Sequence, residues 1–267
     1  MNHAEAFRQL HRDPVLLRLA NAWDAGSARI LEMLGAPAVA TTSAGVAWAL
    51  GYPDGYKLPV QELIRVTANI TRAIRIPLSV DVENGYADEP REVGRVLAPI
   101  FESGAVGINI EDGREAPSLL AAKIEQIKTT AEKLALDVFI NARTDVYLHE
   151  LVGADQRLDE TIKRTKIYRD AGADGIFVPG LTEPHAIRSV VQATELPLNL
   201  LARAGLPDGT ELSKLGVRRL SAGPALSAAA YQTAADLAKD FLETGSSANV
   251  LKNNMSYGQL QGLFKER

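Results

Sequence analysis

Short apolar segments alternate with longer amphipathic ones along most of the chain. The apolar segments are five to seven residues long, and the stretches between them run to about 10 to 20 residues, which is typical of strands and helices alternating around a parallel sheet. Eight segments are predicted to be strands: 15–21, 38–42, 77–82, 106–110, 137–141, 174–178, 197–201 and 218–222. Eight such repeats close into a barrel more naturally than they extend an open sheet, and no glycine-rich dinucleotide-binding turn follows the first. The pattern therefore predicts an α/β fold, a (β/α)8 barrel of the TIM type.

The stretches between the strands carry the periodicity and the end signals of helices. Residues 92–101 place four apolar side chains on one helical face: Val93, Val96, Leu97 and Ile100. Glycine-alanine pairs follow three helices, at Gly35, Gly104 and Gly172, where glycine takes the left-handed conformation that ends a helix. Residues 225–243 predict a long alanine-rich helix after the last strand. We expect residues 1–267 to form a single domain with a C-terminal helical tail from about residue 225.

Composition narrows the range of partners. Apolar residues make up 46% of the 267 residues and charged residues 23%, as in an ordinary globular protein. The net charge of -4 and the 6% of aromatic residues favour neither nucleic acid nor an anionic membrane as a partner. No apolar run approaches the roughly 20 residues of a membrane span, and the polar N-terminal segment lacks the apolar core of a signal peptide. We therefore expect a cytoplasmic protein with no nucleic acid or membrane partner.

Ionisable side chains follow three neighbouring predicted strands. Asp81 and Glu83 end the third strand, two residues apart and thus on one face. Glu111 ends the fourth strand and Arg143 the fifth, and the C-terminal ends of barrel strands meet at one mouth. Burying several carboxylates is costly unless a cation neutralises them, and oxygen ligands favour Mg²⁺, with Mn²⁺ as the second choice. Arg143 is a candidate to receive a substrate carboxylate in a bidentate fork.

Each of these residues also has a structural interpretation. An acidic residue at the end of a strand often caps the next helix or lies in a solvated loop, and Asp112 is expected to be such a cap. The alternative for Arg143, taken alone, is that it bridges two loops. Two later loops add weaker candidates for substrate binding, His185 after the sixth strand and Arg203, for a distal carboxylate, after the seventh. The residue pattern leaves these alternatives open.

Several motifs resemble those of the isocitrate lyase/phosphoenolpyruvate mutase superfamily. DVENGY at 81–86 matches the pattern D-x-[DE]-x-G-Y that follows the third strand in that superfamily, and IED at 110–112 matches the acidic pair after the fourth. NAWDAGSA at 21–28 is similar to the opening strand and helix. TSAG at 42–45 and LGYPD at 50–54 are similar to the loop after the second strand. The resemblance extends over most of the chain, from about residue 13 to residue 240.

The resemblance implies a role for each acidic residue of the cluster. Asp81 would ligate Mg²⁺ directly, while Glu83 and Glu111 would act through water or in the outer shell. The metal would chelate the keto and carboxylate oxygens of a small 2-oxo acid and stabilise an enolate as a Lewis acid. Members of the superfamily commonly exchange their last barrel helix between subunits, so a homo-oligomer, a dimer or tetramer, is expected here.

The resemblance also implies substrate-binding groups. Backbone amides around Ser43 and Ala44 would bind the substrate carboxylate or a phosphonate in its place, Asp54 would sit over the reacting centre, and Arg143 would contact the bound acid. Isocitrate and methylisocitrate lyases carry a K-x-C-G-H loop after the fourth strand, but residues 113–119 read GREAPSL and the chain has no cysteine. A cysteine-dependent lyase is therefore not expected, and the gating loop of the phosphonomutases is not matched either.

The expected function is that of a Mg²⁺-dependent lyase acting on a small 2-oxo acid or its precursor through an enolate, by C–C cleavage or decarboxylation. Two alternatives remain at this point. One is cleavage or rearrangement of a P–C bond, as in a phosphonopyruvate hydrolase or mutase. The other is a 2-oxo acid binder without catalytic activity. The loop at residues 113–119 is short, and a short loop over the site favours a smaller substrate or a broader substrate range.

Overall fold

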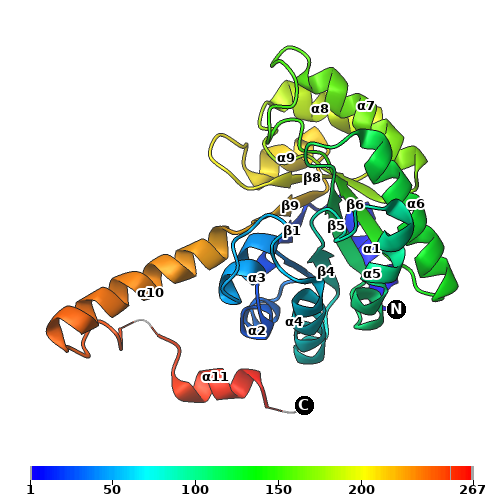
Figure 1. The fold of residues 1–267 in the computed structure, drawn as a ribbon. Helices are drawn as coiled ribbons and strands as arrows, with labels where there is room; N and C mark the ends of the chain where they lie inside the picture. The colour runs from blue at the N-terminus through cyan, green and yellow to red at the C-terminus, as the bar shows by residue number, and fades with distance from the viewer. Residues whose placement is uncertain (1, 253, 266–267) are drawn as a thin grey trace.

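The computed structural model describes residues 2–252 and 254–265, and within them strands and helices alternate around a closed parallel sheet (Figure 1). The strands are β1 (Leu17–Leu19), β2 (Asn21–Ala22), β3 (Val39–Thr41), β4 (Leu78–Asp81), β5 (Gly107–Glu111), β6 (Phe139–Arg143), β7 (Gly175–Phe177), β8 (Leu198–Leu201) and β9 (Arg219–Ser221). The helices are α1 (His3–Arg12), α2 (Ala25–Met33), α3 (Ser43–Ala49), α4 (Val60–Ala73), α5 (Pro90–Glu102), α6 (Pro117–Lys133), α7 (Arg157–Asp170), α8 (Pro184–Thr194), α9 (Gly209–Leu215), α10 (Ala225–Thr244) and α11 (Tyr257–Leu263).

All strand pairs are parallel, in the order β1-β9-β8-β7-β6-β5-β4-β3-β2. Only Ala20 lies between β1 and β2, so these two short strands together form one strand of the barrel. β1 pairs with β9 on one side, and β2 pairs with β3 on the other. The sheet thus closes, and the predicted (β/α)8 barrel is confirmed. Each of the eight predicted strands is found, and the first is split in two.

The helices also follow the sequence pattern. In α5, Val93, Leu97 and Ile100 are fully buried against the core, as the apolar stripe predicted. Gly35, Gly104 and Gly172 all have positive φ, of 85°, 101° and 102°. Because a residue with a Cβ is strained at such angles, glycine is what lets each helix turn back into the next strand.

The N-terminal end of the barrel is closed by α1. This helix directs Phe7 and His11 into the barrel, where both rings contact the Phe139 ring, with centroid distances of 5.5 Å and 4.1 Å. Phe7 and His11 thus form a plug at this end of the barrel. Gly107 on β5 makes room for it, since a Cβ at Gly107 would lie 2.7 Å from the Phe7 ring. With this end sealed, the open C-terminal ends of the strands are left for a ligand.

The C-terminal tail leaves the barrel as the predicted long helix. α10 projects from the end of β9, and α11 returns to pack beside α2 (Figure 1). Within the part of the chain that the structure describes, no helix combines the length and the apolar character needed to cross a membrane.

Candidate functional site

A cavity of about 180 Å³ opens at the C-terminal ends of the strands. Five residues expected at the site from the sequence line it together: Ser43, Ala44, Asp54, Asp81 and Arg143. They come from the ends of β4 and β6, from the start of α3 and from the loop after it. The barrel therefore brings residues up to 100 positions apart in the sequence to one small space.

Asp81 ends β4 and is held from several sides. Its backbone N–H donates to the Thr41 hydroxyl over 2.8 Å, and its carboxylate accepts from the Glu83 amide over 3.1 Å. Burial raises the pKa of Asp81, with Arg143 and the amides of Glu83 and Ser43 acting in the opposite direction. Asp54 adds to the increase through like-charge repulsion. This carboxylate is thus buried without full compensation of its charge.

Glu83 lies just behind Asp81. Its backbone has a positive φ of 49°, which is uncommon for a residue with a side chain. The carboxylate accepts hydrogen bonds from the Tyr56 amide and, over 3.3 Å, from the Tyr86 hydroxyl. Burial and the neighbouring Asp81 raise the pKa of Glu83 to about 7.

Glu111 ends β5 and forms an ion pair of 2.6 Å with Nη1 of Arg143. The Tyr56 hydroxyl donates to its other oxygen over 2.7 Å. Burial raises the pKa of Glu111 to about 8, against the opposing effect of Arg143. Tyr56 thus joins Glu83 and Glu111 through its amide and its hydroxyl. This tyrosine is not among the site residues predicted from the sequence, where its place two residues after Asp54 is the signal that could have indicated it.

Arg143 lines the cavity, but its guanidinium is already engaged. Nε and Nη2 donate to the two oxygens of Asp145 over 2.7 and 3.1 Å, while Nη1 pairs with Glu111. Burial opposes its charge, yet Glu111 and Asp145 raise the pKa of Arg143 on balance. The two-nitrogen edge that was expected to receive a substrate carboxylate is therefore occupied by Asp145. A contact from Arg143 to a bound acid remains a prediction.

The expectation that Asp112 caps the next helix is wrong. The residue at the cap position of α6 is Ala116, and the Asp112 side chain is fully buried. Its carboxylate accepts from the Arg164 guanidinium over 2.9 Å, the Tyr168 hydroxyl over 2.5 Å and the Asp145 amide over 2.9 Å. Asp112 thus fixes the backbone of Asp145, which in turn orients the guanidinium at the cavity.

Comparison with known proteins decides the family, since the phosphoenolpyruvate phosphomutase family model matches residues 7–242. The chain belongs to the phosphoenolpyruvate phosphomutase family. The resemblance that the sequence motifs indicated is confirmed.

Two relatives above 30% identity and one more distant structural neighbour are similar to this chain over most of its length. A crystal structure from Burkholderia cenocepacia J2315, provisionally assigned as a phosphonomutase, is 40% identical, with a TM-score of 0.84 over 89% of this chain and 99% of its own. An oxaloacetate decarboxylase of Bradyrhizobium sp. (strain ORS 278) is 31% identical over 97% of this chain and 88% of its own length. Oxaloacetate acetylhydrolase, at 23% identity and a TM-score of 0.86 over 98% of this chain and 94% of its own, shows the shared fold alone.

Members of the wider superfamily generally use a divalent metal, typically Mg²⁺. Among the described residues, no group of three or more His, Cys, Asp or Glu side chains is arranged to hold an ion. The donor chemistry nevertheless fits a hard cation, because Asp81 presents oxygen to the cavity while Glu83 and Glu111 lie behind it. Burial is the main cause of the raised pKa of each carboxylate and repulsion by neighbouring carboxylates adds to it, so a cation bound beside them would lower all three pKa values.

His185 and Arg203 lie outside this cavity. They line a neighbouring pocket of about 590 Å³. Tyr147 lines that pocket while Leu148, the next residue, lines the cavity with Asp81, so the same segment of chain borders both spaces. Binding of substrate by His185 or Arg203 remains a prediction.

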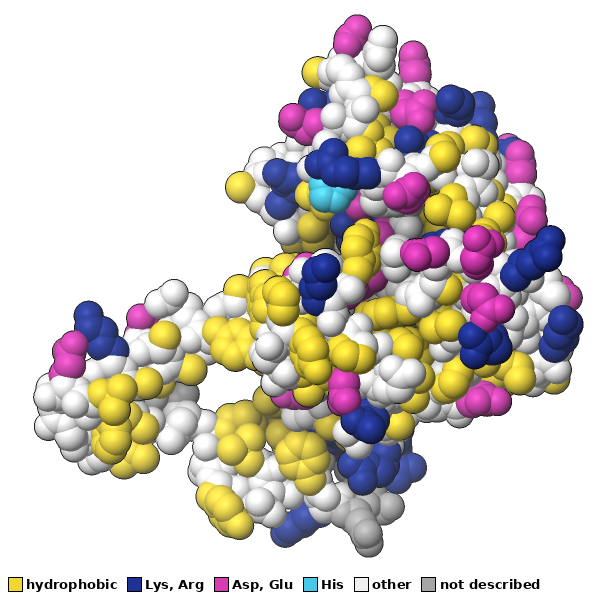
Figure 2. All heavy atoms as spheres, in the orientation of Figure 1, with side chains coloured by type: hydrophobic (Ala, Val, Ile, Leu, Met, Phe, Trp, Pro, Cys, Tyr) yellow, Lys and Arg dark blue, Asp and Glu magenta, His cyan; other side chains and the backbone are white. Residues whose placement is uncertain are grey.

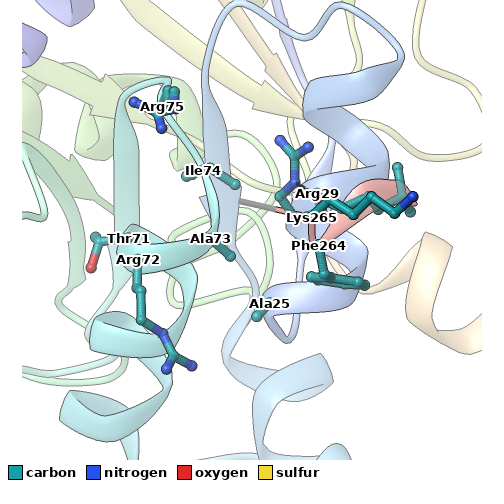
Figure 3. A pocket seen from close by; sticks show the side chains of 10 residues that line it. Ala25, Arg29, Thr71, Arg72, Ala73, Ile74, Arg75, Phe264 and Lys265 are labelled. Atoms are coloured by element: carbon teal, nitrogen blue, oxygen red, sulfur yellow. Dashed lines mark hydrogen bonds between the residues drawn. The ribbon is translucent and has the colours of Figure 1, made fainter. Parts of the chain in front are cut away.

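A larger cavity, of about 830 Å³, lies on the outside of the barrel (Figure 3). Arg29 of α2, Arg72 and Arg75 at the end of α4, and Lys265 of the tail surround it, and Arg29 donates to the Leu263 carbonyl over 2.8 Å. The described residues that line it include no carboxylate. This cavity shares no lining residue with the one at the C-terminal ends of the strands, so it is not part of the candidate site.

Proposed function

We propose that this chain is a Mg²⁺-dependent lyase that acts on a small 2-oxo acid or its precursor through an enolate, by C–C cleavage or decarboxylation. The observation that carries the proposal is the meeting of Ser43, Ala44, Asp54, Asp81 and Arg143 around one cavity. A volume of about 180 Å³ suits a small acid rather than a large ligand. The relationship to a decarboxylase at 31% identity supports this reaction class.

The residues of the cavity divide into two functions. Asp81 would hold the ion directly, with Glu83 and Glu111 reaching it through water. Bound there, Mg²⁺ would supply Lewis-acid stabilisation of negative charge on the substrate oxygens. Backbone amides around Ser43 and Ala44 would bind the substrate carboxylate.

Asp54 and Arg143 would complete the site. Asp54 lines the same wall as Asp81 and would stand over the reacting centre. Arg143, held by Asp145 and Glu111, would present a fixed positive charge to the bound acid. Because the guanidinium is positioned before the substrate arrives, little reorganisation is needed when charge develops.

Binding and turnover assays test the proposal. We expect oxalate and small 2-oxo acids to raise the melting temperature only when Mg²⁺ is present. Asp81→Ala should abolish that effect, whereas Glu115→Ala, an exposed acidic residue of the next loop, should retain it. Oxalate binding by Asp81→Ala at wild-type affinity would show that the metal site has been placed wrongly.

The relative at 40% identity favours a second candidate, cleavage or rearrangement of a P–C bond. Phosphate release from phosphonopyruvate would identify the hydrolase, and its conversion to phosphoenolpyruvate the mutase. Release of CO₂ from oxaloacetate without either reaction would identify the decarboxylase. Tight binding with no turnover of any of these acids would indicate a binder without catalytic activity.

We also propose that the chain forms a homo-oligomer in which α10 is exchanged between subunits. Apolar side chains are exposed along the projecting tail (Figure 2): Leu226, Tyr231, Phe241, Leu242, Tyr257, Leu260 and Phe264. A second copy of the chain would remove this surface from water. Analytical ultracentrifugation tests the proposal. A monomer at micromolar concentration would refute it.

A further inference from the structure

Beneath the cavity floor lies a guanidinium that has no carboxylate among its hydrogen-bond partners. Arg219 on β9 is fully buried in the barrel interior. Its Nε donates to the Ser221 hydroxyl over 3.2 Å and its Nη2 to Oδ1 of Asn109 over 3.3 Å, while Nη1 has no partner. Burying such a cation costs several kcal/mol. A leucine or methionine would occupy this position without that cost, so the hydrogen-bond donors of Arg219 are what distinguish it here.

The contact to Asn109 gives Arg219 a direct connection to the site. Asn109 lies opposite Asp81 in the pairing of β5 with β4, and both side chains line the cavity. Its Oδ1 accepts from Arg219 and also from Nδ2 of Asn141, over 2.9 Å. A guanidinium has only donors, so the amide must turn its oxygen toward Arg219 and its nitrogen away.

The amide nitrogen of Asn109 is therefore the end left for the cavity. No described residue accepts a hydrogen bond from it. A second asparagine of the cavity wall, Asn21, shows the contrast: its Nδ2 donates to the Thr41 carbonyl over 2.8 Å, and its Oδ1 accepts from the Gly223 amide over 2.8 Å. Both ends of the Asn21 amide are thus bonded to the backbone, whereas the two N–H groups of Asn109, beside Asp81, have no acceptor among the described residues.

We propose that Asn109 donates a hydrogen bond to the bound acid and that Arg219 is the positioning residue that fixes its amide for this purpose. The inference rests on the proposed function, namely that a 2-oxo acid binds beside Asp81. The oxygens of such an acid are acceptors in every state, and the surrounding carboxylates offer them no donor. A neutral N–H donor stabilises the negative charge that develops on these substrate oxygens. The side-chain oxygen of Asn109 accepts from Arg219, so it does not compete for the cation.

Oxalate binding in the presence of Mg²⁺, measured by calorimetry, tests Asn109. We expect Asn109→Ala to weaken oxalate binding roughly 10- to 100-fold, the loss of one hydrogen bond to a charged acceptor. Asn109→Asp should weaken it at least as much, because it presents an acceptor in place of the donor. Mg²⁺ affinity measured without oxalate should stay within about threefold for Asn109→Ala, since the residue serves the acid and not the ion.

Asn199 provides the matched control. It is equally buried, accepts from the Ser221 hydroxyl over 3.1 Å and does not line the cavity. Asn199→Ala should leave oxalate affinity within about threefold of wild type. Failure of the wild-type protein to bind oxalate would refute the proposed function itself. Wild-type binding together with equally tight binding by Asn109→Ala would refute the role of Asn109 alone.

Two variants of Arg219 test the positioning role. Arg219→Met removes the donor while keeping the side-chain length, and replacement of a buried charge by an apolar group often leaves a protein folded. We expect oxalate to bind at least tenfold more weakly to Arg219→Met, and Arg219→Lys, which keeps a donor, to restore most of the affinity. Combining Arg219→Met with Asn109→Ala should weaken binding no further than Asn109→Ala does. Two results would refute the positioning role: wild-type affinity for oxalate in Arg219→Met, or a loss of affinity in the double variant equal to the sum of the two single losses.

Discussion

The buried carboxylates of the site should make the metal-free protein less stable as the pH rises. The pKa of Glu83 is raised to about 7 and that of Glu111 to about 8, from an ordinary value of 4.5. The folded protein therefore holds these protons more tightly than the unfolded chain does. The stability that the protonated Glu83 and Glu111 contribute is fully present below about pH 4.5. It is lost as the pH rises through their pKa values in the folded protein, about 7 and about 8.

The size of the effect follows from the shifts. One pKa unit corresponds to about 1.4 kcal/mol. The two contributions do not add in full, because both carboxylates interact with the same neighbour, Asp81, so we expect a loss on the order of 2–4 kcal/mol. For a chain of this size, each kcal/mol changes the melting temperature by roughly 2–4 °C. The melting temperature should thus fall by roughly 5–15 °C between about pH 5.5 and pH 8.5.

Thermal unfolding in EDTA and in excess Mg²⁺ measures this loss. Mg²⁺ replaces the protons, so the increase in melting temperature that it causes should be larger at about pH 8.5 than at about pH 5.5. Glu111→Gln, which cannot ionise, should flatten the pH dependence in EDTA. The exposed Glu115→Gln, in the adjacent loop, controls for general effects of charge. A melting temperature that stays constant or rises with pH in EDTA would refute the reasoning.

Three further predictions concern stability. Asp112→Ala should cost about 3–5 kcal/mol, because it leaves a buried guanidinium and hydroxyl without their acceptor, whereas Glu115→Ala should cost less than about 0.5 kcal/mol; urea unfolding measures both. Gly85→Ala should lower the melting temperature more than Gly35→Ala, since both have positive φ but only at Gly85 would the Cβ lie 2.5 Å from a neighbouring side chain. Phe7→Ala should cost about 3–5 kcal/mol by emptying the plug of the barrel, and an unchanged unfolding midpoint would contradict this.

The strands could be predicted because buried parallel strands form short, mostly apolar segments, and helix-ending glycines precede three of them. The break at Ala20, which divides the first predicted strand into β1 and β2, could not be predicted from the sequence. Residues before it pair with β9 and residues after it with β3, and which neighbour a residue meets depends on the stagger of the closed barrel. No local pattern of apolar and polar residues encodes that stagger.

The site shows a similar division. Asp81, Glu111 and Arg143 could be placed at one mouth because strand ends are set by the fold. Tyr56 reaches Glu83 and Glu111 only through the path of the loop before α4, which the sequence pattern does not describe. Loop paths are set by a few turns and by packing, so residues on loops are the ones that sequence reasoning misses.

The interactions around Arg143 explain how the barrel tolerates so much buried charge. From the outside inward, Arg164 of α7 pairs with Asp112, Asp112 accepts from the amide of Asp145, and Asp145 holds Arg143. Each buried polar group in this chain of contacts has a partner, so it stabilises the fold and leaves the guanidinium a single orientation. On the cavity side of Arg143, burial raises the pKa of Asp81 and of Glu111 despite the opposing effect of the guanidinium. The raised pKa values of this cluster thus belong to carboxylates on the side of Arg143 where a cation and an acid would bind.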